Sequence, residues 1–135
     1  MRIAWALLLA ACGPGHFDRD RMDAVVARAR PIVTEPGKVY RLSLDRDLDP
    51  ASLAPMPEPA LLGRGNGRGL VRAAIDARRH LAVSIETRDD GHAGEYGFMY
   101  TDDGFDRADL EGVQLDSQHE QRIDDGWVTW HFDLD

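Results

Sequence analysis

The chain has 135 residues, the size of one domain when domains run to about 100–200 residues. Its 43% hydrophobic and 30% charged residues exclude a disordered tail and a protein with several membrane spans. The 16 basic and 24 acidic side chains give a formal net charge of −8. We expect no nucleic-acid partner, because phosphate binding needs a basic surface. The single cysteine excludes an intramolecular disulfide and a cysteine-rich zinc site.

The first eleven residues have the pattern of a secretory signal peptide. Arg2 supplies a positive start, an apolar run follows over residues 3–11, and the breaker cluster Cys12-Gly13-Pro14-Gly15 ends it. The run is far shorter than the roughly 20 residues that a membrane-spanning helix needs. We therefore expect residues 1–11 to direct export rather than to belong to the folded domain.

The end of this run, Leu9-Ala10-Ala11-Cys12, resembles the lipobox of bacterial lipoproteins, in which an aliphatic residue and two small residues precede a cysteine. In that family the cysteine is lipidated and becomes the new N-terminus. The resemblance implies that Cys12 holds the protein to the lipid bilayer of the cell envelope, on the periplasmic side or at the outer surface. Residues 12–17 would form the tether. The resemblance covers residues 1–15 and implies nothing about the domain that follows.

The mature chain opens with a helix pattern over residues 18–30. Asp18 or Asp20 is a suitable cap for its first turn, and Pro31 ends it. One apolar stripe recurs at spacings of three and four residues, as Met22, Val25, Val26 and Ala29. We expect this amphipathic helix to pack on the domain's own sheet.

The apolar pattern then changes to a period of two, which indicates strands. Asp124-Asp125-Gly126 is a turn signal, and residues 77–80 would join two strands as a hairpin. The irregular Pro- and Gly-rich stretch at about 45–69 is long for a compact domain, so it is a functional or a disordered loop. The segments expected to form strands are 39–44, 70–76, 81–86, 95–101, 111–115 and 127–134.

A helix followed by strands with short links predicts an α+β domain over residues 18–135. The sheet would be antiparallel, with five or six strands and the helix packed on one face. A small β-barrel with a peripheral helix is the alternative.

The densest polar cluster lies between two of these expected strands. Asp89, Asp90, His92 and Glu95 supply carboxylates and an imidazole, which suit a divalent metal or acid–base chemistry, and two glycines let the backbone approach a ligand. The same pattern is typical of a polar hairpin loop. We expect no cofactor beyond a divalent metal at this cluster.

The last expected strand offers a second candidate surface. Val128, Trp130 and Phe132 face one way and are expected in the core. Trp127 and His131 face the other way, where we expect Trp127 to be partly exposed and to form a binding surface with His131.

Three functions are open at this point. The first is a membrane-anchored envelope lipoprotein whose domain binds a ligand or an envelope protein. The second is a metal-assisted envelope hydrolase built on the Asp89–Glu95 cluster. The third is an inhibitor or immunity protein that blocks a basic envelope enzyme with its acidic surface. We favour the first, because no serine has the Gly-x-Ser-x-Gly setting of a nucleophile elbow and the cysteine belongs to the lipobox.

Overall fold

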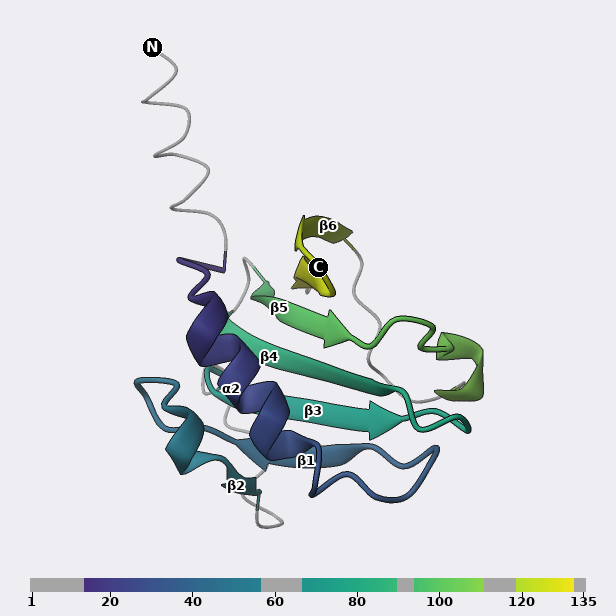
Figure 1. Ribbon diagram of the computed structural model, residues 1–135. Coiled ribbons are helices and arrows are strands. Elements are labelled where there is room, and N and C mark those ends of the chain that lie inside the picture. Colours follow the sequence, from purple (N-terminus) through teal and green to yellow (C-terminus); the bar gives the residue numbers. More distant parts are fainter. Residues whose placement is uncertain (1–13, 57–66, 90–93, 111–118, 133–135) are drawn as a thin grey trace.

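One helix lies across one face of an antiparallel sheet in this protein (Figure 1). The structure is a computed structural model that describes residues 14–56, 67–89, 94–110 and 119–132. The described residues form a seven-stranded sheet in the order β2-β1-β3-β4-β5-β7-β6. The elements are α2 (Arg19–Ala29), β1 (Tyr40–Ser43), η1 (Pro50–Ser52), β2 (Ala54–Pro55), β3 (Leu70–Ile75), β4 (Leu81–Asp89), β5 (Glu95–Thr101), η3 (Arg107–Leu110), β6 (His119–Asp124) and β7 (Trp127–Phe132).

The α+β class is confirmed, and two finer expectations are corrected. The barrel alternative is wrong, because the sheet is open and ends at β2 on one edge and β6 on the other. The strand number is higher than expected, because two strands were not predicted: β2, in the Pro-rich stretch that we expected to be irregular, and β6, which leads into the Asp124-Asp125-Gly126 turn. Pro55 fits there because an edge strand tolerates a residue without a backbone N–H. The short strand expected over 111–115 lies outside the described residues.

The helix forms where its pattern predicts it. The Asp18 carboxylate caps α2 by accepting the N–H of Arg21 at 3.2 Å. Its apolar stripe is buried against the sheet, with Val25 fully inaccessible. Burying each such side chain contributes about 1.5–3 kcal/mol, so packing rather than helix propensity holds α2 in place.

Trp127 is part of this core, contrary to our expectation. Only 1% of it is exposed, and its indole N–H donates to Asp23 on α2 at 2.9 Å. Phe17 packs edge-on against Trp127 and against Phe98, with ring centroids 5.3 and 5.0 Å apart. The expectation failed because α2 covers the face of β7 that carries Trp127 and His131, which we expected to be a partly exposed binding surface.

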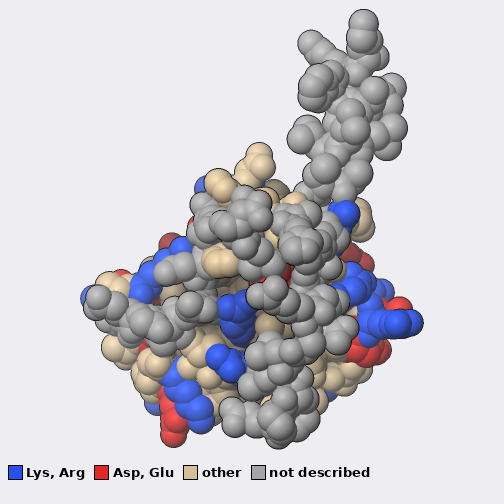
Figure 2. Space-filling view, turned by 180° about the vertical axis from the view of Figure 1, so that it is seen from behind, with Lys and Arg blue, Asp and Glu red and all other residues tan. Residues whose placement is uncertain are grey.

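The face of the sheet away from α2 is also packed. Trp130 is 5% exposed, and its indole N–H donates to the carbonyl of Phe98 at 3.2 Å. The register places Arg41, Arg72 and Arg122 on this face, and Figure 2 shows basic side chains gathered near its middle. Both faces therefore contribute buried tryptophan, which alternation along one strand cannot reveal.

Gly97→Ala tests how closely β5 packs against β4 and against Trp130. A Cβ at Gly97 would overlap with the carbonyl of Ile85 and lie 2.6 Å from the Trp130 ring. We expect a loss of about 3 kcal/mol in the free energy of unfolding, measured by urea denaturation.

Gly37→Ala is the matched control. Gly37 has a φ of +80° and nothing within 4 Å of an added Cβ, so only the left-handed conformation opposes the change and about 1 kcal/mol is expected. Equal losses in the two variants would contradict this account of the packing.

Candidate functional site

Four planar side chains form a row across four neighbouring strands. The register pairs Arg88 of β4 with Tyr96 of β5, Tyr96 with His131 of β7, and His131 with His119 of β6. Tyr96 shares a face with Phe98, so the row lies on the α2 side of the sheet. His119 is exposed and the other three are half-buried, so the row, unlike the core, is accessible to solvent.

The side chains of this row contact one another in sequence, and two of the rings are stacked. Tyr96 and His131 are parallel within 3°, with ring centroids 4.3 Å apart. The His119 ring lies 5.7 Å from that of His131 and is tilted by 32°, and the Arg88 guanidinium carbon lies 5.8 Å from the Tyr96 centroid. Directly paired cross-strand residues are close enough for such contacts. His131 is therefore held between the rings of Tyr96 and His119.

The β4–β5 hairpin supports His131 from a further side. Gly94 has a φ of +108°, and a Cβ there would lie 2.8 Å from Nε2 of His131. Glycine is needed at this position for the backbone to pass so close to the imidazole.

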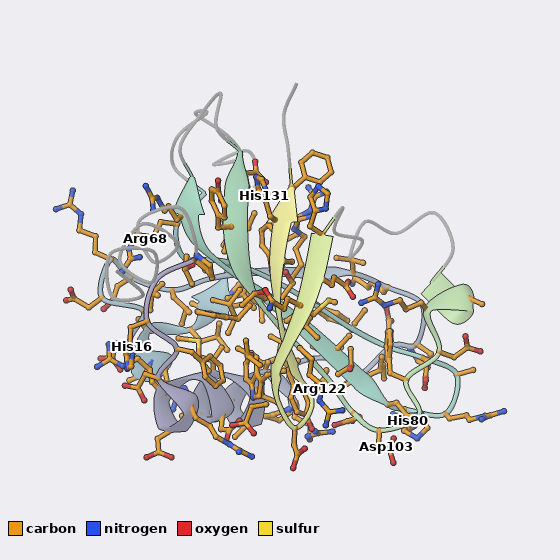
Figure 3. All side chains as sticks on the ribbon, turned by 90° about the horizontal axis from the view of Figure 1, so that it is seen from above. His16, Arg68, His80, Asp103, Arg122 and His131 are labelled. Atoms are coloured by element: carbon orange, nitrogen blue, oxygen red, sulfur yellow. The ribbon has the colours of Figure 1, made fainter. Side chains whose placement is uncertain are left out.

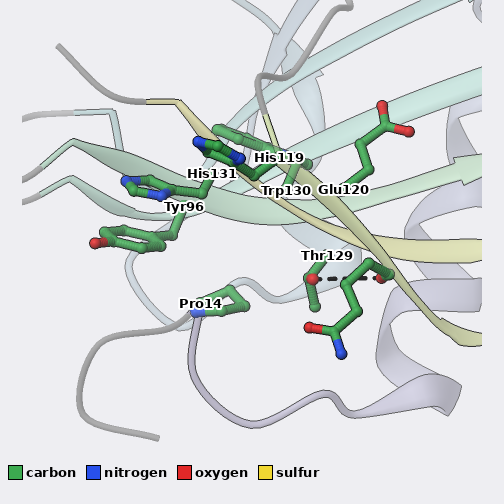
Figure 4. A pocket seen from close by; sticks show the side chains of 8 residues that line it. Pro14, Tyr96, His119, Glu120, Thr129, Trp130 and His131 are labelled. Carbon is green, nitrogen blue, oxygen red and sulfur yellow. Dashed lines mark hydrogen bonds between the residues drawn. The ribbon is translucent and has the colours of Figure 1, made fainter. Parts of the chain in front are cut away.

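An open pocket of about 410 Å³ adjoins the stack, within the size range of ligand sites (Figure 4). Its wall includes the hydroxyl of Thr129, which donates to the carbonyl of Gln121 at 3.3 Å. The carboxylate of Glu120 is bound by Arg107 at 2.6 Å, and the register places this side chain on the face of the sheet opposite His131. The lining residues, called the His131 pocket below, are Pro14, Tyr96, His119, Glu120, Gln121, Thr129, Trp130 and His131.

Pro14 brings the start of the described chain into this wall. Its carbonyl accepts the hydroxyl of Thr87 at 2.6 Å. Thr87 is 4% exposed and sits where the β4–β5 register shifts between Glu86 and Arg88. The residues just before α2 are thus fixed to β4 beside the pocket.

The expected acidic cluster is only partly described. Asp89 and Glu95 pair across the end of the β4–β5 hairpin, while Asp90 and His92 lie outside the described residues. Glu95 is half-buried and points to the face opposite Tyr96 and His131, because side chains alternate along β5. Among the described residues, no group of three or more His, Cys, Asp or Glu side chains converges as a metal site would.

His131 belongs to the site and Trp127 does not. His131 is the one lining residue that was predicted as a site residue, and His119 and Gln121 of β6 are among those that sequence reasoning missed. The turn at Asp125-Gly126 was the available signal, since a hairpin closed there brings β6 alongside β7 and His119 opposite His131. These two imidazoles are suitable transition-metal ligands, but a catalytic zinc site uses three protein ligands.

A separate polar cluster lies at the other end of the sheet, where Figure 3 shows His80 and Asp103 far from His131. Asp76 is fully buried and accepts the backbone N–H groups of Arg78, His80 and Asp106. Its second oxygen lies 3.1 Å from Nδ1 of His80. Burial alone would raise the pKa of Asp76, but these hydrogen bonds outweigh burial and lower it. Asp76 therefore organises the β3–β4 turn.

Asp102 fastens the end of α2 to the same end of the sheet. It accepts two hydrogen bonds from the Arg30 guanidinium at 2.8 and 2.9 Å, one from the N–H of Leu81 at 2.7 Å and one from the Tyr100 hydroxyl at 2.8 Å. Burial opposes the charged form, but these donors lower the pKa of Asp102 to about 2. Every acceptor position is used within the fold, so we assign this cluster to stability.

No protein-family model, curated protein or solved structure matches this chain. Within the described ranges, no helix has the length and apolar character needed to cross a bilayer.

Asp102→Asn tests the assignment of Asp102 through the pH dependence of stability. The pKa is about 2 in the folded protein against 3.8 for an ordinary aspartate, so its contribution is complete above pH 4. This contribution to the free energy of unfolding is lost as the pH falls from about 4 to 2, and it amounts to at most about 2 kcal/mol. We expect the variant to lose this pH-dependent part of the unfolding free energy, measured by urea denaturation at several pH values.

Asp103, the exposed neighbour of Asp102, supplies the control for these measurements. Asp103→Asn is expected to keep the wild-type pH profile. A wild-type profile in Asp102→Asn would show that the Arg30–Asp102 pair is not what holds this end of the helix.

Proposed function

We propose that this protein is a cell-envelope lipoprotein, anchored through lipid on Cys12, whose domain binds a ligand in the His131 pocket. The lipobox resemblance of Leu9-Ala10-Ala11-Cys12 supports the anchor. The pocket, with its stacked rings and its hydroxyl and amide groups, supports binding.

The main support for the proposal is that Pro14 lies both next to the proposed anchor, Cys12, and in the pocket wall. Pro14 stands two residues after Cys12 and lines the pocket. The Thr87 hydroxyl holds its carbonyl, so the tether starts at the pocket wall rather than at a remote surface. A ligand bound there sits beside the membrane attachment point.

The chemistry of the lining favours a polar ligand held by hydrogen bonds. Tyr96 and His119 occupy the two faces of His131, so that ring leaves no flat surface on which an apolar ligand could stack. The Gln121 side chain is exposed at the rim and provides both an amide donor and a carbonyl acceptor.

Lipidation is tested by mass spectrometry of the protein expressed in a bacterium. We expect the mature N-terminal peptide to begin at Cys12 and to carry lipid, because the lipobox cysteine is the modified residue in the family that it resembles. Cys12→Ala is expected to lose the lipid and to leave the membrane fraction.

Gly13→Ala is the matched control for this variant and is expected to be lipidated, since it leaves the lipobox cysteine in place. A wild-type chain that is uncleaved, or cleaved elsewhere without lipid, would overturn the anchor.

Ligand binding is tested with a photo-reactive benzoylphenylalanine in place of Gln121, irradiated in living cells. We expect a discrete adduct whose added mass identifies what lies in the pocket. The same probe at the exposed Arg78, in the β3–β4 turn, is expected to give no such adduct. Identical results at the two positions would count against a ligand site at the His131 pocket.

A further inference from the structure

The geometry of the tether restricts how the domain can sit on a membrane. Consecutive Cα atoms are 3.8 Å apart, so the Cα atom of Cys12 lies within about 8 Å of that of Pro14. Each headgroup layer of a bilayer is roughly 5–8 Å thick. A lipid on Cys12 therefore leaves no length of chain with which Pro14, or the pocket wall that it forms, can move far from the headgroups.

The opposite end of the sheet stands well away from this point. β4 spans nine residues from Leu81 to Asp89, which at about 3.3 Å per residue is roughly 26 Å. Thr87 holds Pro14 near the last residues of β4, and the β3–β4 turn with Arg78 precedes its first residue. The pocket end and the β3–β4 turn therefore lie at different distances from Cys12, and a label on the protein surface can distinguish them.

The side chains at the pocket end suit the boundary between lipid and water. Phe132, at the end of β7, is one of two large apolar side chains that stay exposed among the described residues, at 37%. Tyr96 and His131 are half-buried next to it, and both rings carry polar atoms. Aromatic side chains with a polar edge are enriched at membrane interfaces because one part is apolar and the other is wet.

We infer that the pocket end of the sheet rests on the bilayer and that the His131 pocket takes the headgroup of a phospholipid. This inference rests on the proposed lipidation of Cys12 and adds an orientation and a ligand class to it. The exposed Gln121 amide and the His119 imidazole are the donors that face the phosphate oxygens of the headgroup.

The orientation is tested with spin labels on the lipidated protein in phosphatidylcholine vesicles. Cys12 is the only natural cysteine, so once it carries lipid an introduced cysteine is the only free thiol. We expect a nitroxide at Gln121→Cys to collide with a water-soluble nickel chelate severalfold less often than one at Arg78→Cys. Equal collision rates, with lipid on Cys12 verified by mass, would overturn the orientation but not the proposed lipidation. A chain without lipid would instead overturn the proposed function.

Headgroup uptake is tested separately, by NMR in phosphatidylcholine bicelles that contain a lipid with a nitroxide on its headgroup. We expect the His119 imidazole signal to broaden severalfold more than that of His80, at the other end of the sheet. Thr129→Trp fills the pocket without touching the anchor and is expected to remove most of this difference. Broadening that is unchanged in Thr129→Trp, or equal for both histidines, would overturn the assignment of the headgroup to the pocket.

Discussion

The register of β5 against β7 is the constraint on which both the core and the pocket depend. It sets Tyr100 opposite Trp127, which lies beneath α2. Four residues further along each strand, on the same face of the sheet, it sets Tyr96 opposite His131. A slip of one residue would turn each of these side chains to the other face of the sheet. The packing of Trp130 over Gly97 fixes that register from the opposite side, because only glycine leaves room for the indole.

The two ends of the sheet serve different purposes. At one end Asp76 and Asp102 gather backbone and side-chain donors, and their satisfied carboxylates stabilise the turn and the end of α2. At the other end the rings of Tyr96 and His131 remain half-exposed beside a cavity, and the chain leading to Cys12 starts from the cavity wall. With lipid on Cys12, as we propose, this arrangement would bring the pocket, rather than the most tightly bonded end of the sheet, to the membrane.

Sequence periodicity predicted where the helix and strands form better than it predicted which of their side chains are buried. The stripe containing Met22 and Val25 was enough to predict α2 and its buried face, and alternation was enough to predict β3, β4, β5 and β7. Alternation could not say which face of β7 the helix would cover, so Trp127 was assigned to the wrong environment. His119 was missed because its partner is twelve residues away across a hairpin, and strand pairing rather than local pattern brings it to His131.

Strand pairing brings the rings of Tyr96, His131 and His119 into one row beside the pocket. The most direct measurement is a two-dimensional nuclear Overhauser spectrum of the aromatic protons. We expect cross-peaks between the Tyr96 ring and the His131 imidazole, whose centroids are 4.3 Å apart, and weaker ones between His131 and His119 at 5.7 Å. A folded protein in which His131 gives cross-peaks to neither ring would contradict the stack, and with it the pocket that the stack lines.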